Sequence, residues 1–470
     1  MTFVFRRSLP VLFVATVLAG CGGSGGDSVS SGATPTSQTT PTPIISPSAS
    51  PTATPTPAPD TTRGQAPIPA TGLVPVSNAA GQTTRISPAT LPPPYDTPSA
   101  SNGPSVSARP DGTGLTVPPG FYVYAWANNL TGARTLITAP NGDIFLAQSS
   151  QGRITVLRDA DRDGVPETRT TFAEGRNFPF GMALYPSGPN PQWLYVAETN
   201  RVVRYPYTVG SLAAGGSPQV VVDGLPTGGH STRGIAFNPS GTKMYVSVGS
   251  NSNVAEEEER RAAILEFNPD GSGYRVFASG LRNPVHLAVH PQTGALWTSV
   301  NERDGLGDNL VPDYLTSVAD SGFYGWPYYY IGANHDPRMP DRSELASRSL
   351  VPSLLFQSHS APLGFCFYTG NAFPADYTGN AFVALHGSWN RVERTGYKIV
   401  RVRLDAAGQP MGAYEDFMTG WQSGDTVWGR PVGVTAAGDG SLLVSDDGAG
   451  VVWRVTYGLT PPASRKTGIR

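Results

Sequence analysis

The sequence predicts an all-β protein, a six-bladed β-propeller preceded by a disordered tether rich in Ser, Thr and Pro. A short strand-like phrase of apolar, aromatic and small residues follows a Pro or Gly turn six times. Gly (55) and Pro (45) are both frequent, as expected of a turn-rich chain with a low-complexity tail. A unit of several strands repeated at roughly 40–50 residues is typical of a propeller, with one repeat per blade. The six copies are 140–147, 186–197, 239–247, 291–299, 374–384 and 438–445.

The runs around these copies supply the other strands of each blade. Residues 234–237 and 432–434 precede the third and sixth copies, and residues 154–157 and 451–455 follow the first and sixth. These runs are short, apolar and bounded by turn residues, which indicates strands. We therefore expect the functional site at one mouth of the channel that the six blades enclose.

The first 21 residues have the features of an export signal. Arg6 and Arg7 precede the apolar run 11–17, which leads to the sequence Leu-Ala-Gly-Cys ending at Cys21. A basic start followed by a short apolar segment predicts export rather than a membrane span. The Leu-Ala-Gly-Cys sequence resembles the bacterial lipobox, which implies cleavage before Cys21 and lipid on its sulfur. A plain secretory signal is the alternative. Because an Asp does not follow Cys21, we expect an outer-membrane lipoprotein facing the periplasm.

Composition divides the remaining chain into three parts. Residues 22–114 are dominated by Ser, Thr, Pro, Gly and Ala, so they bury too little apolar surface to offset the entropy of ordering. This segment is predicted to be a disordered linker, although its apolar end, residues 91–95, is a candidate for packing on the domain. The propeller is expected over 115–458, and residues 459–470 form a polar tail.

Charge and cysteine content narrow the functional classes. The formal net charge of −2 gives no indication of electrostatic capture of nucleic acid. Besides Cys21, the only cysteine is Cys366, which alternates with aromatic residues as in a strand. Lipidation of Cys21 would leave Cys366 without a partner, so we expect a small buried hydrophobic side chain there.

An acidic loop follows the third strand of the first repeat. Its carboxylates alternate before a glycine in the sixth place, which is a pattern that wraps a hard cation. Thr170 occupies the place where an EF-hand loop would have Glu, so the loop is not an EF-hand. The sequence favours a structural calcium site here as much as a solvated acidic turn. The predicted ligands are Asp159, Asp161, Asp163 and Glu167.

Cations precede the first strand of several repeats. Arg134, Arg282 and Arg430 hold equivalent places in the first, fourth and sixth repeats, so together they would surround one mouth with positive charge. The planar guanidinium group suits carboxylates. A polyanionic ligand with planar carboxylates is therefore expected, unless some of these arginines merely pair with nearby Asp residues.

Other polar residues occur at the same end of the repeats. His230 follows two glycines, which favours an accessible general base, with a surface-loop histidine as the alternative. Glu302, Asp304 and Asp308 lie within seven residues among Gly and Asn, a pattern that suits a divalent cation. Trp389 and Arg391 add an aromatic wall and a further cation after the fifth repeat.

Six motifs in order resemble one known family. They are residues 229–237, LRNP at 281–284, NERD at 301–304, GFYGWP at 322–327, HGSWNR at 386–391 and WGRPVGV at 428–434. Together they are similar to the L-sorbosone dehydrogenase-like group of soluble quinoprotein sugar dehydrogenases, also called soluble PQQ-dependent aldose sugar dehydrogenases. The resemblance covers most of residues 115–457.

The resemblance implies a propeller that binds pyrroloquinoline quinone (PQQ) and Ca²⁺ at one mouth. A sugar or sugar aldehyde would lose a proton to a histidine and a hydride to the quinone. Carried over by position, the catalytic residues are His230, Arg282 and Asn283. The implied cofactor-binding residues are Arg233, Arg282, Asn283, Trp389, Arg391 and Arg430, and the implied ligands of the catalytic Ca²⁺ are Glu302, Asp304 and Asp308.

The implied partners are a small sugar or aldehyde substrate and an electron acceptor of the respiratory chain. Two other functions stay open on the sequence alone. One is a calcium-dependent lactonase-type hydrolase, which would need carboxylates rather than arginines converging on the channel. The other is a binding propeller without catalytic activity, since a fold does not imply a function.

Overall fold

The computed structural model describes residues 80–458. The predicted signal peptide with Cys21, the predicted linker up to residue 79 and the polar tail 459–470 lie outside the described residues. Of the predicted tether, only residues 80–114 are therefore open to comparison.

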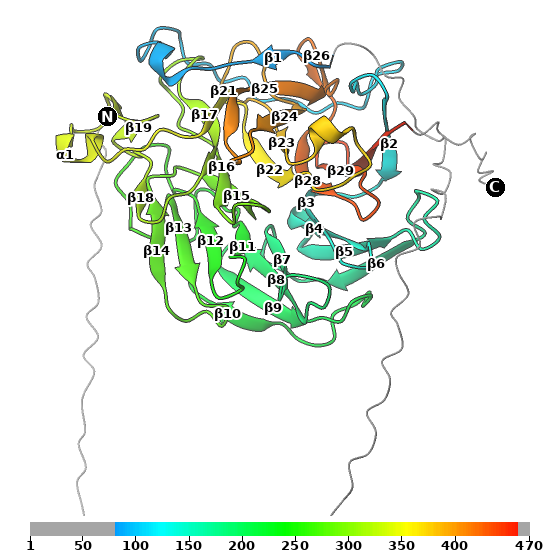
Figure 1. Cartoon of the computed structure of the whole chain (residues 1–470). Helices are drawn as coiled ribbons and strands as arrows, with labels where there is room; N and C mark the ends of the chain where they lie inside the picture. Colours follow the sequence, from blue (N-terminus) through cyan, green and yellow to red (C-terminus); the bar gives the residue numbers. More distant parts are fainter. Residues whose placement is uncertain (1–79, 459–470) are drawn as a thin grey trace, which may run out of the picture. The chain divides into compact units, whose positions relative to one another are not determined.

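Six antiparallel sheets form the blades of a propeller, which confirms the predicted fold (Figure 1). The first four blades are: blade 1, β3 (Ala133–Thr138), β4 (Ile144–Gln148), β5 (Arg153–Arg158) and β6 (Thr168–Ala173); blade 2, β7 (Met182–Tyr185), β8 (Trp193–Glu198), β9 (Arg201–Pro206) and β10 (Gln219–Val222); blade 3, β11 (Ile235–Phe237), β12 (Met244–Val248), β13 (Ala263–Phe267) and β14 (Arg275–Ser279), extended by β18 (Gly322–Phe323); blade 4, β15 (Pro284–Val289), β16 (Leu296–Val300), β17 (Pro312–Ser317) and β21 (Leu354–Ser358).

The last two blades use strands from both ends of the described chain. Blade 5 is β22 (Pro362–Phe367), β23 (Ala381–Leu385), β24 (Lys398–Leu404) and β25 (Pro410–Met418), extended by β1 (Thr83–Thr84); blade 6 is β28 (Pro431–Ala436), β29 (Leu442–Asp446), β30 (Val451–Tyr457) and β2 (Phe121–Ala127). Because β2 pairs with β30, an early strand completes the last blade and closes the ring (Figure 1).

Each repeated sequence phrase is the second strand of a blade, and its small residue faces the neighbouring blade. The Ser299 hydroxyl donates to the Leu363 carbonyl oxygen at 2.5 Å, which joins blade 4 to blade 5. The Ser445 hydroxyl makes the same kind of bond to the Arg134 carbonyl oxygen, joining blade 6 to blade 1. A large side chain in this place would separate the blades, which explains why the phrase ends in Ala or Ser.

The first strands approach one another closely around the axis. At Gly433, an added Cβ would lie 2.5 Å from the Arg134 carbonyl oxygen, so only glycine fits between β28 and the first strand of blade 1. Gly181 has the same relation to the Arg233 carbonyl oxygen, at 2.6 Å. The inner strands therefore contact one another all the way round the ring.

Apolar side chains fill the axis near the start of the inner strands. Phe180, Val285, Leu363 and Val432 form one buried cluster and come from blades 2, 4, 5 and 6. In a ring of six, blades 2 and 5 lie opposite each other, so a cluster that contains residues of both must span the axis. We call this cluster the axial plug.

The two ends of the propeller carry different loops. First strands begin, and second strands end, at the same end of the antiparallel blades; we call this end the mouth. The Pro and Gly turns of the repeated phrase join first to second strands and therefore lie at the opposite end. Residues that directly precede a first strand or follow a second strand gather at the mouth.

Residues 80–114 lie along the propeller, which differs from the linker expected over 22–114. We call this segment the strap (Figure 1, blue). Its strand β1 pairs with the outer strand β25, and a 3-10 turn, η1 (Pro88–Thr90), follows. Leu91 packs against the apolar core cluster of blades 3 and 4, so the packing expected of residues 91–95 is confirmed for this residue.

The remaining short elements lie outside the main blade strands. They are β19 (Tyr329–Tyr330), β20 (Asn334–His335), α1 (Ser343–Ala346), β26 (Gln422–Ser423), β27 (Thr426–Val427), η2 (Ser149–Gln151) and η3 (Ala375–Tyr377). Residues 254–262 form a loop that contains a short turn. Cys366 is a free cysteine in β22 that packs against the apolar core but is only partly buried, whereas the sequence predicted a buried side chain. Over residues 80–458 no helix has the length and apolar character needed to cross a membrane.

Candidate functional site at the mouth

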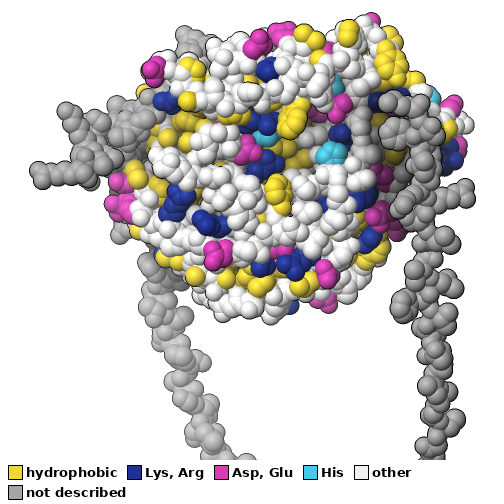
Figure 2. Space-filling view, turned by 180° about the vertical axis from the view of Figure 1, so that it is seen from behind, with side chains coloured by type: hydrophobic (Ala, Val, Ile, Leu, Met, Phe, Trp, Pro, Cys, Tyr) yellow, Lys and Arg dark blue, Asp and Glu magenta, His cyan; other side chains and the backbone are white. Residues whose placement is uncertain are grey.

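Polar loops from four blades meet at the mouth. His230 and Arg282 precede the first strands of blades 3 and 4, and residues 301–309 follow the second strand of blade 4. Residues 386–394 follow the second strand of blade 5, and Arg430 precedes the first strand of blade 6. Figure 2 shows a hollowed face on which basic and histidine side chains gather beside acidic and hydrophobic ones.

His230 is held with one ring nitrogen engaged. Its Nδ1 lies 2.8 Å from the Ser250 carbonyl oxygen, which can only accept, so Nδ1 carries the proton. The neutral ring therefore presents Nε2 as a lone pair. Burial, reinforced by the positive charge of Arg282, lowers the pKa of His230 to about 4. At neutral pH the side chain is thus an uncharged base with its acceptor nitrogen fixed by the fold.

Asn283 lies beside His230. A Cβ added at Gly249 would be 2.5 Å from Asn283 Oδ1 and 2.6 Å from His230 Cβ, so the two side chains converge over a position that must be glycine. Asn283 Oδ1 is buried without a hydrogen-bond partner. A buried acceptor of this kind is costly unless a ligand or water donates to it.

Arg282 lies in a buried position and is largely used by the protein itself. Its guanidinium donates to the carbonyl oxygens of Glu302 (2.8 Å) and Asn253 (3.2 Å). Its Nη2 lies 3.6 Å from the Asp304 carboxylate. Arg282 therefore fixes the loop after β16 and supplies positive charge near His230, and burial lowers its own pKa.

Asp304 belongs to a pair that the sequence did not reveal. Its Oδ1 lies 3.1 Å from His359 Nδ1, and His359 Nε2 lies 3.0 Å from the Gly307 carbonyl oxygen. Burial, the largest single effect, opposes the charge on His359, but the hydrogen bonds to Asp304 and Gly307 together with the charges of Asp304 and Asp313 outweigh it, so the pKa of His359 is raised. The partner of His359 is thus contributed by a loop 55 residues away in the sequence.

Asp308 and Arg391 join two loops at the mouth. Arg391 donates to the Asp308 carbonyl oxygen at 2.6 Å and to Asn309 Oδ1 at 3.1 Å. The Val392 amide donates to Asp308 Oδ2 at 2.8 Å. The other carboxylate oxygen of Asp308, Oδ1, is buried and has no partner. Arg391 thus holds the loop that carries Asp308, and Asp308 keeps one oxygen free for a ligand.

A second charged cluster lies on the side of blades 5, 6 and 1. Asp447 accepts from Arg134 at 2.6 Å and lies 2.9 Å from His386 Nε2. Arg430 has its guanidinium 5.5 Å from the ring centre of Trp389, which is 56% exposed, and its buried Nη2 has no partner. Arg134 is thus neutralised by Asp447, as expected if an arginine at the mouth pairs with a nearby Asp, although its Nε, like Nη2 of Arg430, is buried without a partner.

Two sequence-predicted site residues are buried and bonded mainly to the protein itself. Arg233 is 0% exposed and donates to the carbonyl oxygens of Pro226, Thr232 and His230. Its guanidinium shapes the loop that carries His230, and a direct cofactor contact by Arg233 stays a prediction.

Glu302 is likewise a structural residue. Its carboxylate lies 2.9 Å from Nε of Arg303, and both side chains are 0% exposed. Arg303 also donates to the carbonyl oxygens of Pro327 and Tyr329, which belong to the aromatic segment after β18. The ion pair therefore anchors the loop after β16 to that segment through Oε2, while Glu302 Oε1 is buried without a partner, so its role as a Ca²⁺ ligand stays a prediction.

The acidic loop of blade 1 lies far from this chemistry. It joins the third to the fourth strand, so it is at the opposite end from the mouth. The carboxylates of Asp159, Asp161, Asp163 and Glu167 each offer an oxygen, and these oxygens all lie within 4.8 Å of one another. Calcium binding there stays a prediction from the sequence, and a catalytic role is excluded by position.

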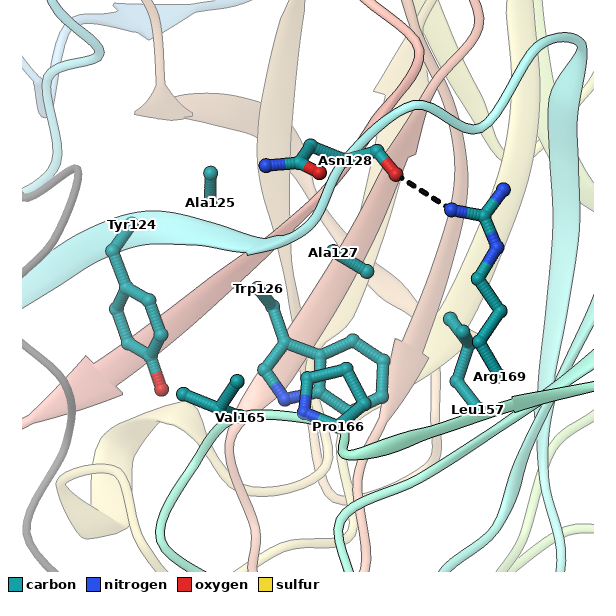
Figure 3. Close-up of a pocket in the computed structure, with 9 residues that line it drawn as sticks. All are labelled: Tyr124, Ala125, Trp126, Ala127, Asn128, Leu157, Val165, Pro166 and Arg169. Atoms are coloured by element: carbon teal, nitrogen blue, oxygen red, sulfur yellow. Dashed lines mark hydrogen bonds between the residues drawn. The ribbon is translucent and has the colours of Figure 1, made fainter. Parts of the chain in front are cut away.

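A groove of about 270 Å³ lies beside the acidic loop, between blades 6 and 1 (Figure 3). Trp126 and Tyr124 of β2 form one wall, and Val165 and Pro166 form the other. Arg169 crosses one end and donates to the Asn128 carbonyl oxygen at 2.9 Å. None of the residues that line it belongs to the mouth.

The free polar atoms at the mouth test which ligand the site suits. Among the described residues of the mouth, Arg430 Nη2 is a buried unpaired donor, and Asn283 Oδ1 and Asp308 Oδ1 are buried unpaired acceptors. A donor of this kind suits a carboxylate, and carboxylate and amide oxygens suit Ca²⁺. The residues present therefore fit an anionic, carboxylate-bearing group together with a hard cation.

The fold and the mouth define a β-propeller protein with a polar ligand site at one end of its channel. A family model described as TrAA12-like matches residues 115–313 and 334–458. The chain therefore belongs to the TrAA12-like family. The match leaves out the strap and also residues 314–333, which contain the GFYGWP motif.

Curated relatives and solved structures agree with this assignment. The chain is 35% identical to an uncharacterized protein of Borreliella burgdorferi, over 48% of this chain and 61% of the relative. It is 26% identical to a pyrroloquinoline quinone-dependent pyranose dehydrogenase of Coprinopsis cinerea, over 72% of this chain and 54% of the relative. The chain thus spans little more than half the length of these relatives.

Two solved structures show the same fold. The holo form of the PQQ domain of pyranose dehydrogenase from Coprinopsis cinerea has a TM-score of 0.63 and 23% identity, covering 75% of this chain and 99% of that one. The calcium structure of a Trichoderma reesei family AA12 protein has a TM-score of 0.64 and 20% identity, covering 76% and 99%. At these identities the likeness establishes the architecture alone.

Proposed function

We propose that the protein is a PQQ- and Ca²⁺-dependent dehydrogenase that oxidises a sugar or sugar aldehyde. The observation that carries the proposal is the convergence of His230, with a free Nε2, and the unpaired polar atoms of Asn283, Asp308 and Arg430 at one mouth. A relative named as a PQQ-dependent pyranose dehydrogenase and a related structure titled as a calcium form support it.

In this proposal each residue has a defined task. Arg430 binds a carboxylate of the cofactor through its free Nη2, and Trp389 offers an exposed ring for stacking. Asp308 Oδ1 and Asn283 Oδ1 are the candidate oxygen ligands for Ca²⁺ or hydrogen-bond acceptors for the substrate. PQQ, when bound, supplies a two-electron acceptor for hydride. Arg391 and Arg282 position the loops without needing to contact the ligand.

His230 is the proposed general base. Its Nε2 accepts the proton of a sugar hydroxyl, and the Ser250 carbonyl oxygen stabilises the resulting imidazolium through Nδ1–H. The nearby positive charge of Arg282 opposes this protonation, so the proton is released again readily. A base that returns to its neutral form after each turnover is what a redox cycle of this kind requires.

The hydrolase alternative has less support from the mouth. A hydrolytic centre would need carboxylates free to bind a cation and activate water. Instead, Asp304 is paired with His359, and Glu302 is paired internally with Arg303. Asp308 Oδ1 and Glu302 Oε1 are both buried without a partner, but the second oxygen of each carboxylate is engaged by the protein, so neither carboxylate is free as a whole.

Reconstitution tests the proposed function directly. Purified protein is mixed with PQQ and CaCl₂, and reduction of an artificial electron acceptor is followed with a panel of pyranoses, sorbosone and, separately, lactones. The proposal expects sugar-dependent dye reduction that needs PQQ and is lost with a calcium chelator. Lactone hydrolysis without PQQ would reject it in favour of the hydrolase, and sugar binding without either reaction would indicate a binding propeller.

We further propose that Cys21 carries a lipid and holds the propeller at the outer membrane, facing the periplasm, where it passes electrons to a respiratory-chain acceptor. The basis is the sequence before Cys21 alone. Labelling of cells with a fatty-acid analogue tests the first part. The natural chain should incorporate label and Cys21→Ala should not; equal labelling of both would reject lipidation.

A further inference from the structure

The strap crosses the loops that form the candidate site. Tyr95 donates its amide to the Leu306 carbonyl oxygen at 2.8 Å, and the Asn102 amide donates to the Trp389 carbonyl oxygen at 2.6 Å. The strap therefore runs from the loop after the second strand of blade 4 to the loop after the second strand of blade 5. These contacts come from a segment that the family match, which begins at residue 115, does not include.

Thr97 and Ser99 bind the backbone next to the free oxygen of Asp308. The Asp308 amide donates to Thr97 Oγ1 at 2.9 Å, and the Gly307 amide donates to Ser99 Oγ at 3.0 Å. The fit is close, since a Cβ at Gly307 would lie 2.7 Å from the Thr97 carbonyl oxygen. Gly307 also has φ 115°, a conformation that favours glycine.

Asn102 makes the equivalent contacts on the opposite loop. Its side-chain nitrogen donates to the Val392 carbonyl oxygen at 3.0 Å. Arg394 in turn donates to Asn102 Oδ1 at 2.7 Å and to its carbonyl oxygen. Asn102 is therefore bonded through its amide, its carbonyl and both side-chain heteroatoms to the loop that carries Trp389 and Arg391.

Asp308 is consequently fixed from three sides. Its amide is held by Thr97, its carbonyl oxygen by Arg391 and its Oδ2 by the Val392 amide. Only Oδ1 is left, buried and without a partner. A buried carboxylate oxygen kept apart from every protein donor indicates a position prepared for a cation or another ligand.

We propose that the strap is part of the binding site, and that Thr97 and Asn102 are positioning residues that hold Asp308 and the Trp389 loop in their ligand-binding geometry. This inference rests on the proposed function, because it takes the ligand to be PQQ with Ca²⁺. The strap's hydrogen bonds to these loops are additional to the contacts that the loops make within the propeller.

Substitution of Thr97 in the full chain tests the inference. Thr97→Val keeps the shape and removes the acceptor of the Asp308 amide, whereas Thr97→Ser keeps the acceptor. Loss of a hydrogen bond of this kind should weaken Ca²⁺ and PQQ binding by up to about ten-fold, measured by titration of the quinone absorbance. Thr97→Ser should restore binding. Asn102→Ala should weaken PQQ binding similarly.

Ser87→Ala is the matched control. Ser87 lies in the same strap, and its hydroxyl accepts only from the Ala89 amide within η1, so its removal should leave both affinities unchanged. The inference would be overturned if Thr97→Val bound Ca²⁺ and PQQ as tightly as the natural chain does. It would also be overturned if Ser87→Ala and Thr97→Val lost the same affinity for these ligands.

Hydrogen exchange separates this inference from the proposed function. The amides of Gly307 and Asp308 should be protected in the natural chain and should exchange faster in Thr97→Val, with or without ligand. If the natural chain binds no PQQ, the proposed function fails, and hydrogen exchange then tests the strap's role by itself. Faster exchange in Thr97→Val supports the positioning role, and unchanged exchange rejects it.

Discussion

His230 donates through Nδ1 to the Ser250 carbonyl oxygen at 2.8 Å, and this one bond decides which nitrogen of the ring is available for chemistry. A carbonyl oxygen has no proton to give, so Nε2 is the basic nitrogen over the whole pH range in which the ring is neutral. Asn283, which converges with His230 over Gly249, provides the neighbouring unpaired acceptor.

Replacement of His230 by Gln should lower turnover by about a hundred-fold or more, the usual contribution of a general base, while PQQ affinity changes little. Steady-state dye reduction and quinone titration measure the two effects. His290→Gln is the control, because His290 lies in the turn between β15 and β16, at the opposite end from the mouth. Unchanged turnover in His230→Gln would remove His230 from the mechanism.

The low pKa of His230 predicts that activity persists to a lower pH than is usual for a histidine base. Its pKa is lowered to about 4, chiefly by burial, so the ring stays neutral well below the ordinary histidine range. Activity that depends on the neutral base should therefore persist as pH falls through 6.5 and should decline only near pH 4. A pH profile of kcat/KM measures this. A half-maximal point near 6.5 would show that the base is solvated or is a different residue.

The same shift affects stability. The unfolded chain binds a proton at His230 near pH 6.5, whereas the folded chain does so only near pH 4. Between these values the unfolded state holds more protons, so this residue contributes less stability as pH falls from 6.5 to 4. Removing the titratable ring in His230→Gln should therefore reduce the loss of Tm over this interval.

Arg430 should be the arginine at the mouth whose loss most affects cofactor binding. Arg134 is neutralised by Asp447 and Arg391 is bonded to the Asp308 loop, whereas Nη2 of Arg430 is unpaired. Arg430→Gln should weaken PQQ binding by at least about ten-fold, as expected for loss of a charge-assisted bond. Fluorescence titration measures the affinity, and Arg348→Gln, at an exposed site outside the mouth, is the control.

Glu302 should act on stability and not primarily on calcium affinity. It forms a fully buried pair with Arg303, which Asp336 also contacts at 3.3 Å. Glu302→Gln should lower the free energy of unfolding by about 3 kcal/mol, the low end for breaking a buried pair, because Asp336 still neutralises Arg303. Denaturation without calcium measures this. A variant with natural stability but much weaker Ca²⁺ binding would show instead that Glu302 is a metal ligand.

The fold could be predicted because each blade repeats one local pattern. The Pro and Gly turn, the apolar strand and the small residue recur in every blade, and residues such as Ser299 and Ser445 show why the last place must be small. The role of β2 in closing the ring was not predictable in this way, since its pairing with β30 joins residues more than 300 positions apart and leaves no local signature.

The site was predicted in its location but only partly in its contacts. The sequence placed His230, Asn283, Asp308 and Arg430 at one mouth because their repeat positions are equivalent. It could not show that Arg233 faces its own loop's carbonyl oxygens, since a guanidinium can satisfy either the protein or a ligand.

Residues that depend on distant loops were missed. His359 becomes a partner of Asp304 only because the segment after β21 folds back to the loop after β16. Asp447 bridges Arg134 and His386 across the junction of the last and first blades. The one available signal for Asp447 was its repeat position, directly after the sixth copy of the strand phrase.

The axial plug has a consequence for the order of events in turnover. Because Phe180, Val285, Leu363 and Val432 form one buried cluster across the axis, apolar side chains separate the mouth from the opposite end of the propeller. Under the proposed function, the sugar, its oxidised product and the electron acceptor would therefore all use the mouth, one after another. Sequential binding at one opening corresponds to a double-displacement kinetic scheme, in which an excess of either reactant inhibits binding of the other.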